Sequence, residues 1–175
     1  MEEISALAGL SKPVIYGDFS NKLDLYLAVL QQYLDGLVAG VRAALAGGGG
    51  HRDRVHRAVL VYFDLVEDDL AGHVLVFESS VPSEPAVQWR VTTAMRECAA
   101  LLAAEIRAIG VASPRADACA WGLMGASQLA ARDWAEAGRP VSKLEAADIL
   151  ATLCWNGLST FECRRPKPLS TRSIG

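Results

Sequence analysis

Apolar residues recur at every third or fourth position along most of the chain, which is the spacing of an α-helix. Glycine and proline residues interrupt this pattern and divide it into segments. The pattern predicts an all-α fold. The helices that we expect cover residues 2–8, 12–18, 22–46, from 53 to 68 or 69, 70–78, 84–109, 113–137 and 142–162.

The segment Leu7 to Leu25 contains two short predicted helices and a tight turn in front of a long helix. Gly9 ends the first helix, Ser11 can cap the second, and Ser20 with Asn21 opens the long one. A recognition helix in a DNA major groove needs side chains on its outer face and donors for the flanking phosphates. We therefore expect this segment to bind DNA. The residues expected at the DNA are Ser11, Lys12, Pro13, Tyr16, Gly17 and Lys22.

The same segment resembles the helix-turn-helix signature of the TetR family of bacterial transcriptional regulators. The matching residues are Ala8, Gly9, Ser11, Tyr16, Phe19, Lys22 and Leu25. The resemblance implies a TetR-like architecture, in which a divergent helical domain binds a small effector and forms a homodimer. It also implies two departures: the family's first helix would precede Glu2, and Asp18 stands where relatives often have histidine.

These observations predict three parts of the chain. Residues 1–21 form a partial helix-turn-helix DNA-binding domain that lacks its first helix, residues 22–163 form the helical effector-binding and dimerisation domain, and residues 164–175 form a flexible tail. The predicted 22–46 helix runs without a break from the DNA-proximal turn to the body, and Gly47 to Gly50 end it. We expect this helix to transmit a tilt between the two domains.

The last two predicted helices are apolar on nearly all sides, so each must be central or covered by another subunit. We expect them to pair with their copies as a four-helix bundle, with glycines that let the backbones approach. The alternative is a monomeric bundle with the glycines packed internally. The predicted dimer interface contains Trp121, Gly122, Gly125, Ala126, Leu129, Leu150, Cys154, Gly157, Leu158 and Phe161.

The 84–109 helix carries aromatic, hydroxyl, sulfur and charged side chains close together, a composition typical of a site for an apolar ligand. Plain packing in the core or on the surface is the alternative for each residue. The predicted effector-binding residues are Tyr33, Tyr62, Phe63, Phe77, Trp89, Thr92, Met95, Arg96 and Trp121.

Composition narrows the classes of function. The formal net charge of -3 means that contacts with DNA must come from a local group of basic residues. The hydrophobic fraction of 51% and the mean hydropathy of +0.21 favour either an apolar surface that a partner covers or an internal cavity. The four cysteines lie in apolar helical patterns, which indicates buried thiols, with redox sensing as the alternative. The histidines lack the spacing of metal ligands, so we expect neither a metal nor a cofactor. No signal sequence or membrane span is recognisable, so we expect a cytoplasmic protein.

No set of nucleophile, base and acid is recognisable, and the Gly47–Gly50 run lacks the Lys-Ser/Thr of a phosphate-binding loop, so we do not expect an enzyme. We expect a repressor that releases double-stranded operator DNA when a small, largely apolar effector binds. The alternative is a helical dimerisation or small-molecule-binding module that does not bind DNA in this form.

Overall fold

In the computed structural model, residues 19–68 and 84–162 are described, without the side chains of Asp68 and of residues 159–162. The described residues form α-helices and no strand, so the predicted all-α fold is confirmed. The recognition segment, the predicted helix over 70–78 and the tail lie outside them. The helices are α3 (Lys22–Ala46), α4 (His51–Asp68), α6 (Pro85–Ala108), α7 (Ser113–Glu136) and α8 (Lys143–Glu162).

Both ends of α3 agree with the sequence prediction. The Asn21 side chain caps the helix, because its Oδ1 accepts a hydrogen bond of 2.9 Å from the Asp24 amide. At the other end the Gly47 amide donates to the Ala43 carbonyl at 3.1 Å, and the chain then leaves the helix. With 25 residues, α3 is about 37 Å long.

Helix α4 begins at His51, two residues before the predicted start at Asp53. The Asp53 carboxylate accepts a hydrogen bond of 2.9 Å from the Gly50 amide. Asp53 is thus the third helical residue, from which an acidic side chain reaches back to the residue before the helix. The prediction took this carboxylate for the start of the helix.

The starts of α7 and α8 differ from one another in how well they were predicted. Helix α7 begins at Ser113, as predicted; the cap is Ala112, with no side-chain hydrogen bond, and Ser113 with Pro114 forms the first helical turn. Proline is compatible with this turn because the first helical positions need no amide donor. Helix α8 begins at Lys143, one residue after the predicted start, because Ser142 is its cap and its Oγ accepts from the Glu145 amide at 3.2 Å.

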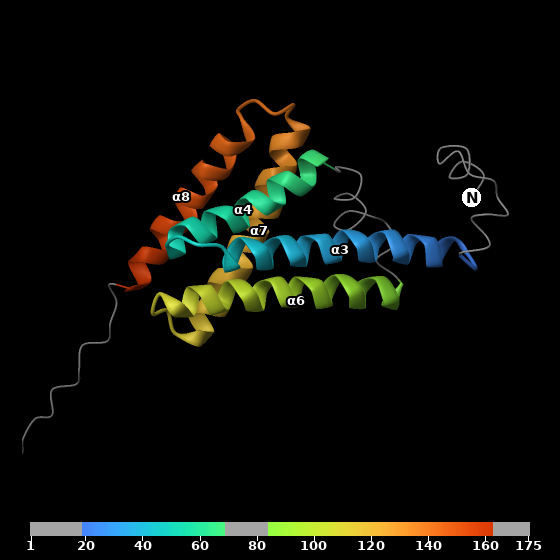
Figure 1. The fold of residues 1–175 in the computed structure, drawn as a ribbon, viewed down its shortest axis with the longest axis horizontal. Helices are drawn as coiled ribbons and strands as arrows, with labels where there is room; N and C mark the ends of the chain where they lie inside the picture. The colour runs from blue at the N-terminus through green and yellow to red at the C-terminus, as the bar shows by residue number, and fades with distance from the viewer. Residues whose placement is uncertain (1–18, 69–83, 163–175) are drawn as a thin grey trace, which may run out of the picture.

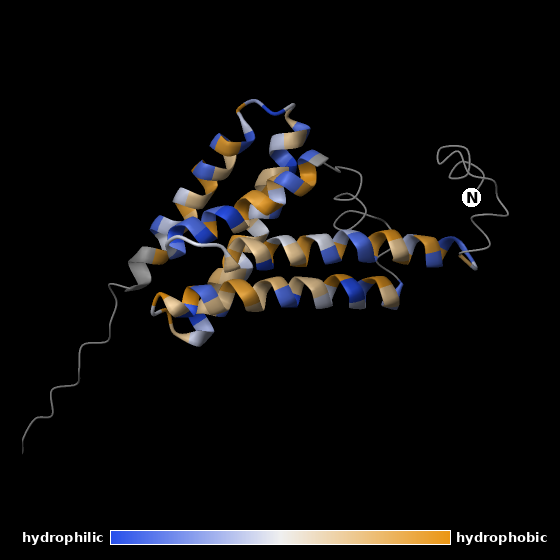
Figure 2. Cartoon of the chain, in the orientation of Figure 1, coloured by the Kyte–Doolittle hydropathy of each residue, from blue (hydrophilic) through white to orange (hydrophobic). Residues whose placement is uncertain are grey.

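The helices surround one core. Figure 1 shows α3 and α6 side by side and running in the same direction, with α4 against α3 and α7 and α8 antiparallel beyond it. Figure 2 shows that hydrophobic and hydrophilic positions alternate with helical spacing on these helices. The largest fully buried side chains include Leu30, Leu34 and Leu37 of α3, Phe63 of α4, and Leu102 and Ile106 of α6.

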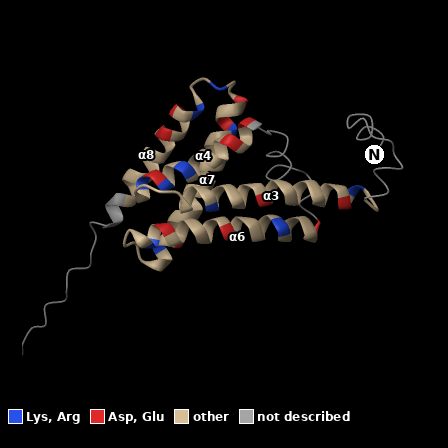
Figure 3. Ribbon diagram, viewed as in Figure 1, with Lys and Arg blue, Asp and Glu red and all other residues tan. Residues whose placement is uncertain are grey.

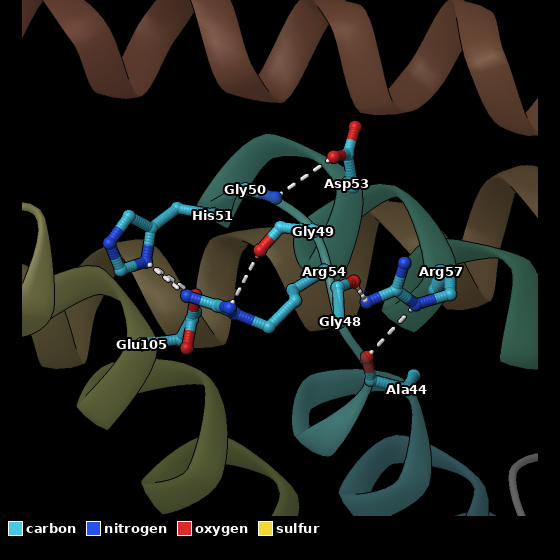
Figure 4. A network of polar contacts seen from close by, with 9 residues as sticks. All are labelled: Ala44, Gly48, Gly49, Gly50, His51, Asp53, Arg54, Arg57 and Glu105. Atoms are coloured by element: carbon cyan, nitrogen blue, oxygen red, sulfur yellow. Dashed lines mark hydrogen bonds and ion pairs between the residues drawn. The ribbon is translucent and has the colours of Figure 1, made fainter.

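The turn between α3 and α4 is fixed by two arginines of α4 (Figure 4). Arg57 donates to the Ala44 carbonyl at 3.1 Å and to the Gly48 carbonyl at 2.8 Å. Arg54 donates to the Gly49 carbonyl at 2.9 Å and, through Nε, to Glu105 of α6 at 2.7 Å. These contacts hold the C-terminal end of α3 and the turn after it against α4 and α6.

Candidate effector site and dimerisation surface

The described part of the predicted DNA-binding set is Lys22, which is exposed in the first turn of α3 next to the Asn21 cap. Ser11, Lys12, Pro13, Tyr16 and Gly17 lie outside the described residues. Their contacts with DNA therefore stay predictions.

The predicted effector-binding residues separate into two groups. Tyr33, Tyr62, Phe63 and Met95 are buried together in the core that α3, α4 and α6 share. Trp89, Thr92 and Arg96 are exposed on the outer side of α6, Trp121 is exposed on α7, and Phe77 lies outside the described residues. The structure therefore does not bring the exposed residues together with the buried ones.

The helical period explains this separation. Met95, Cys98, Leu102 and Ile106 recur at intervals of three and four and form the buried stripe of α6. Residues 89, 92 and 96 point about a third of a turn away from that stripe. The sequence analysis selected these residues by chemical type, which does not indicate the side of the helix.

The interior contains hydrogen-bonding groups from three helices: the hydroxyls of Tyr33 (α3) and Tyr62 (α4) and the thiol of Cys98 (α6). Burial raises the pKa of Tyr62 far above its usual range, with smaller contributions from Cys98 and Tyr33. Burial, with the nearby Glu97 carboxylate, raises the pKa of Cys98 to about 11. Both groups are therefore protonated and neutral at physiological pH.

The prediction that the cysteines are buried thiols agrees best with the structure at Cys98. Cys98 is buried, whereas Cys119 and Cys154 are half-buried, and burial raises the pKa of both of these thiols. Cys163 lies outside the described residues. A thiol with a raised pKa is a poor nucleophile at neutral pH, so these three cysteines suit packing better than redox chemistry.

An open groove on the outer side of α3 and α6 was not predicted from the sequence. It consists of two adjoining hollows of about 640 and 350 Å³ that share Gln31, Asp35 and Arg90, and Arg90 donates to Gln31 Oε1 at 2.7 Å. Trp89 lines the smaller hollow, so this exposed indole belongs to the groove and not to the buried interior. Both carboxylates and guanidinium groups line the groove, which favours a polar occupant over an apolar effector.

Helices α7 and α8 expose large apolar side chains on their outer side. The exposed fraction is 47% for Trp121, 67% for Leu129, 60% for Ile149 and 69% for Leu153, and Figure 3 shows that charged residues are sparse along these stretches. A Cβ atom added at Gly122, Gly125 or Gly157 would meet no neighbour within 4 Å. We call the surface formed by these seven residues the α7–α8 face.

The remaining residues of the predicted interface are more enclosed. Leu150 and Leu158 are buried within the chain itself, and Ala126 and Cys154 are half-buried. The side chain of Phe161 is among those not described. The α7–α8 face is therefore apolar and largely exposed.

Two histidines of α4 lie beside carboxylates. His51 Nδ1 is 2.6 Å from Glu105, and His56 Nε2 is 3.7 Å from Asp148. Among residues 19–68 and 84–162, no group of three or more histidine, cysteine, aspartate or glutamate side chains could hold a metal ion. Within the same ranges, no helix combines the length and the apolar character that a membrane span requires.

The chain matches no family model. It is 42% identical over 160 residues to the HTH-type transcriptional activator FasR of Mycolicibacterium smegmatis, a match that covers 91% of this chain and 73% of that protein.

Solved structures share the fold. The transcriptional regulator FadR from Bacillus subtilis, solved in complex with stearoyl-CoA, superposes with a TM-score of 0.72 at 12% identity, covering 89% of this chain and 87% of that one. A TetR-family transcriptional regulator from Streptomyces coelicolor superposes with a TM-score of 0.71 at 18% identity, covering 92% and 84%.

Proposed function

Because the chain belongs to the TetR family of transcriptional regulators, we propose that it is a homodimer whose affinity for operator DNA is set by a small, largely apolar effector. The observation that carries this proposal is the continuity of α3. This helix runs from the Asn21 cap, next to the predicted recognition segment, to the fixed turn at Gly47–Gly50, and its inner face packs on α4 and α6.

The proposed switch follows from the geometry of DNA. Two recognition helices of a dimer meet successive major grooves on one face of the duplex only when they lie about 34 Å apart. An effector that enters the interior between α3, α4 and α6 must displace α3, because the side chains there are already buried. An effector with higher affinity for the displaced arrangement shifts the population away from the arrangement that fits DNA.

The interior favours an effector with a long apolar portion. Apart from the tyrosine hydroxyls, the cysteine thiol and the indole N–H of Trp134, Ser127 is the only polar side chain among the buried residues described. Its hydroxyl donates to the Leu123 carbonyl at 2.8 Å, and the Trp134 indole donates to the Val141 carbonyl at 2.9 Å. FadR from Bacillus subtilis was solved with stearoyl-CoA. We therefore propose a long-chain acyl compound as the effector of this chain.

The α7–α8 face is the proposed dimer interface. Apolar patches of this kind on soluble proteins mark interaction sites, and two copies can bury the same self-complementary patch through a twofold axis. The open glycines at 122, 125 and 157 would let the helices of the two copies approach closely.

The direction of regulation is a separate part of the proposal. The sequence analysis expects a repressor, whereas the relative of 42% identity is named an activator. The proposed switch controls occupancy of the operator, and occupancy can repress or activate a gene according to where the operator lies. A reporter gene with the operator before or within its promoter distinguishes these outcomes.

The experiment measures DNA affinity with and without effector. DNA sites are first selected by the chain from a random-sequence library, and fluorescence anisotropy then gives their affinity with no addition, with saturating stearoyl-CoA and with coenzyme A alone. We expect stearoyl-CoA to change the affinity by about 5- to 150-fold, and coenzyme A alone to leave it unchanged. An unchanged affinity in saturating stearoyl-CoA contradicts the proposed effector. A chain that binds stearoyl-CoA but selects no DNA is instead the binding module without DNA binding.

A further inference from the structure

The hydroxyl group of Tyr62 is a buried donor without a hydrogen-bond partner among the described residues. The Tyr62 side chain is 3% exposed, and no described nitrogen or oxygen atom forms a hydrogen bond with its hydroxyl. A buried polar group without a partner costs free energy, and phenylalanine would fill the same space without this cost. Packing alone therefore explains the ring of Tyr62 but not its hydroxyl.

The surroundings of this hydroxyl determine which acceptor suits it. Cys98 from α6 and Tyr33 from α3 belong to the same buried, largely apolar core as Tyr62. No Lys, Arg or His is among the buried residues described. A carboxylate placed here would be a buried anion without a cation, which is strongly unfavourable. A carbonyl oxygen is neutral and accepts a hydrogen bond, so it fits.

We propose that the Tyr62 hydroxyl donates a hydrogen bond to the neutral carbonyl oxygen of the acyl group of the effector, and so selects acyl thioesters and esters over free fatty acids. This inference rests on the proposed function and assigns one contact of the effector. The contact also couples binding to movement: the carbonyl reaches Tyr62 only when α3, α4 and α6 separate, because the residues around it are buried.

The test removes one hydroxyl from the protein and one oxygen from the ligand. Binding of stearoyl-CoA and of its thioether analogue S-octadecyl-CoA, which has a methylene group in place of the carbonyl, is measured by calorimetry for the wild type, Tyr62→Phe and the control Tyr26→Phe. Tyr26 is a half-buried tyrosine near the N-terminal end of α3. We expect Tyr62→Phe to weaken stearoyl-CoA binding about tenfold, to leave thioether binding unchanged, and Tyr26→Phe to change neither.

Other results overturn the inference in distinguishable ways. If Tyr62→Phe binds both ligands as the wild type does, or loses affinity for both equally, the proposed contact is wrong while the effector class stands. If the wild type does not bind stearoyl-CoA, the proposed effector class fails and this contact fails with it. The apo Tyr62→Phe variant should be at least as thermally stable as the wild type; a marked loss of stability would mean that the hydroxyl already has a partner, and would also overturn the inference.

The preference for a neutral acceptor has its own comparison. Methyl laurate and laurate carry the same chain and differ in whether the carbonyl group is an ester or a carboxylate. At pH 8 the wild type should bind the ester more tightly, and this preference should fall in Tyr62→Phe. Tighter binding of laurate by the wild type would contradict the selection of neutral acyl groups.

Discussion

The close approach of α3 and α4 at Gly40 can be tested with two substitutions in one helix. A Cβ atom at Gly40 would lie 2.8 Å from Val61 Cγ1, whereas a Cβ atom at Gly36, one turn earlier, would meet nothing within 4 Å. Val61 is β-branched and stiff at χ1, so its methyl group cannot move away freely. Alanine at Gly40 therefore forces α3 and α4 apart, and alanine at Gly36 does not.

The expected magnitudes have opposite signs. In both variants alanine gains about 1 kcal/mol of helix propensity over glycine. Only Gly40→Ala also has the cost of overpacking, typically about 1–3 kcal/mol. Gly36→Ala should therefore be more stable than the wild type by about 1 kcal/mol, and Gly40→Ala should range from unchanged to about 2 kcal/mol less stable.

Urea unfolding followed by far-ultraviolet circular dichroism measures both changes, and unchanged m-values show that the comparison is valid. Val61→Ala provides a double-mutant cycle, because removing the methyl groups of Val61 should relieve most of the cost at Gly40. If Gly40→Ala stabilises the chain as much as Gly36→Ala, then the two helices are not in close contact at this point and the packing described for α3 and α4 is wrong.

Three further predictions concern the dimer, an ion pair and DNA. Leu153→Glu should convert the dimer to monomer in sedimentation velocity, because it places a charge on the α7–α8 face, whereas Val29→Glu on the exposed side of α3 should not; a dimeric Leu153→Glu variant would refute the interface. The Lys143 ammonium, 2.7 Å from Asp64, also hydrogen-bonds Glu67 and lowers the pKa of that carboxyl below its ordinary value of 4.5. The stability that this carboxylate contributes is complete above pH 4.5 and is lost as the pH falls through the lowered pKa. The difference in Tm between wild type and Lys143→Met should therefore be constant between pH 4.5 and the ordinary lysine pKa of 10.5, and shrink below pH 4.5; a difference that does not shrink there would contradict the assignment. Lys22→Ala should weaken binding to all DNA sequences alike and reduce the slope of log affinity against log salt by about one, and a loss confined to one sequence would contradict a phosphate contact.

Local signals along the chain are sufficient to predict most of the helix boundaries. Asn21 and Gly47 mark the ends of α3, and Ser142 marks the start of α8, because each residue satisfies or replaces a backbone hydrogen bond within a few positions. The start of α7 at Ser113 also agrees with the prediction, because the Ser-Pro pair suits the first helical turn, where no amide donor is needed.

The candidate site could be predicted only in part. Tyr33, Tyr62, Phe63 and Met95 are apolar or aromatic residues on the inner stripes of three helices, and the helical period places them inside. Trp89, Thr92 and Arg96 have the composition of a site but lie on the outer side of α6. That the hydroxyl of Tyr62 has no hydrogen-bond partner among the described residues depends on the distances between three helices, which no local pattern encodes.

The arginines at the turn after α3 fix one end of this helix, whereas its other end lies about 37 Å away. Arg54 and Arg57 hold the turn to α4 and to Glu105 of α6. In the proposed switch α3 would therefore rotate about a point near Gly47, and its displacement would grow with distance from that point. Over a length of about 37 Å, a rotation of about 5° moves the opposite end by about 3 Å. In a twofold dimer both arms move, so a change of this size inside the body alters the reach between half-sites by up to about 6 Å, compared with the roughly 34 Å that the duplex requires.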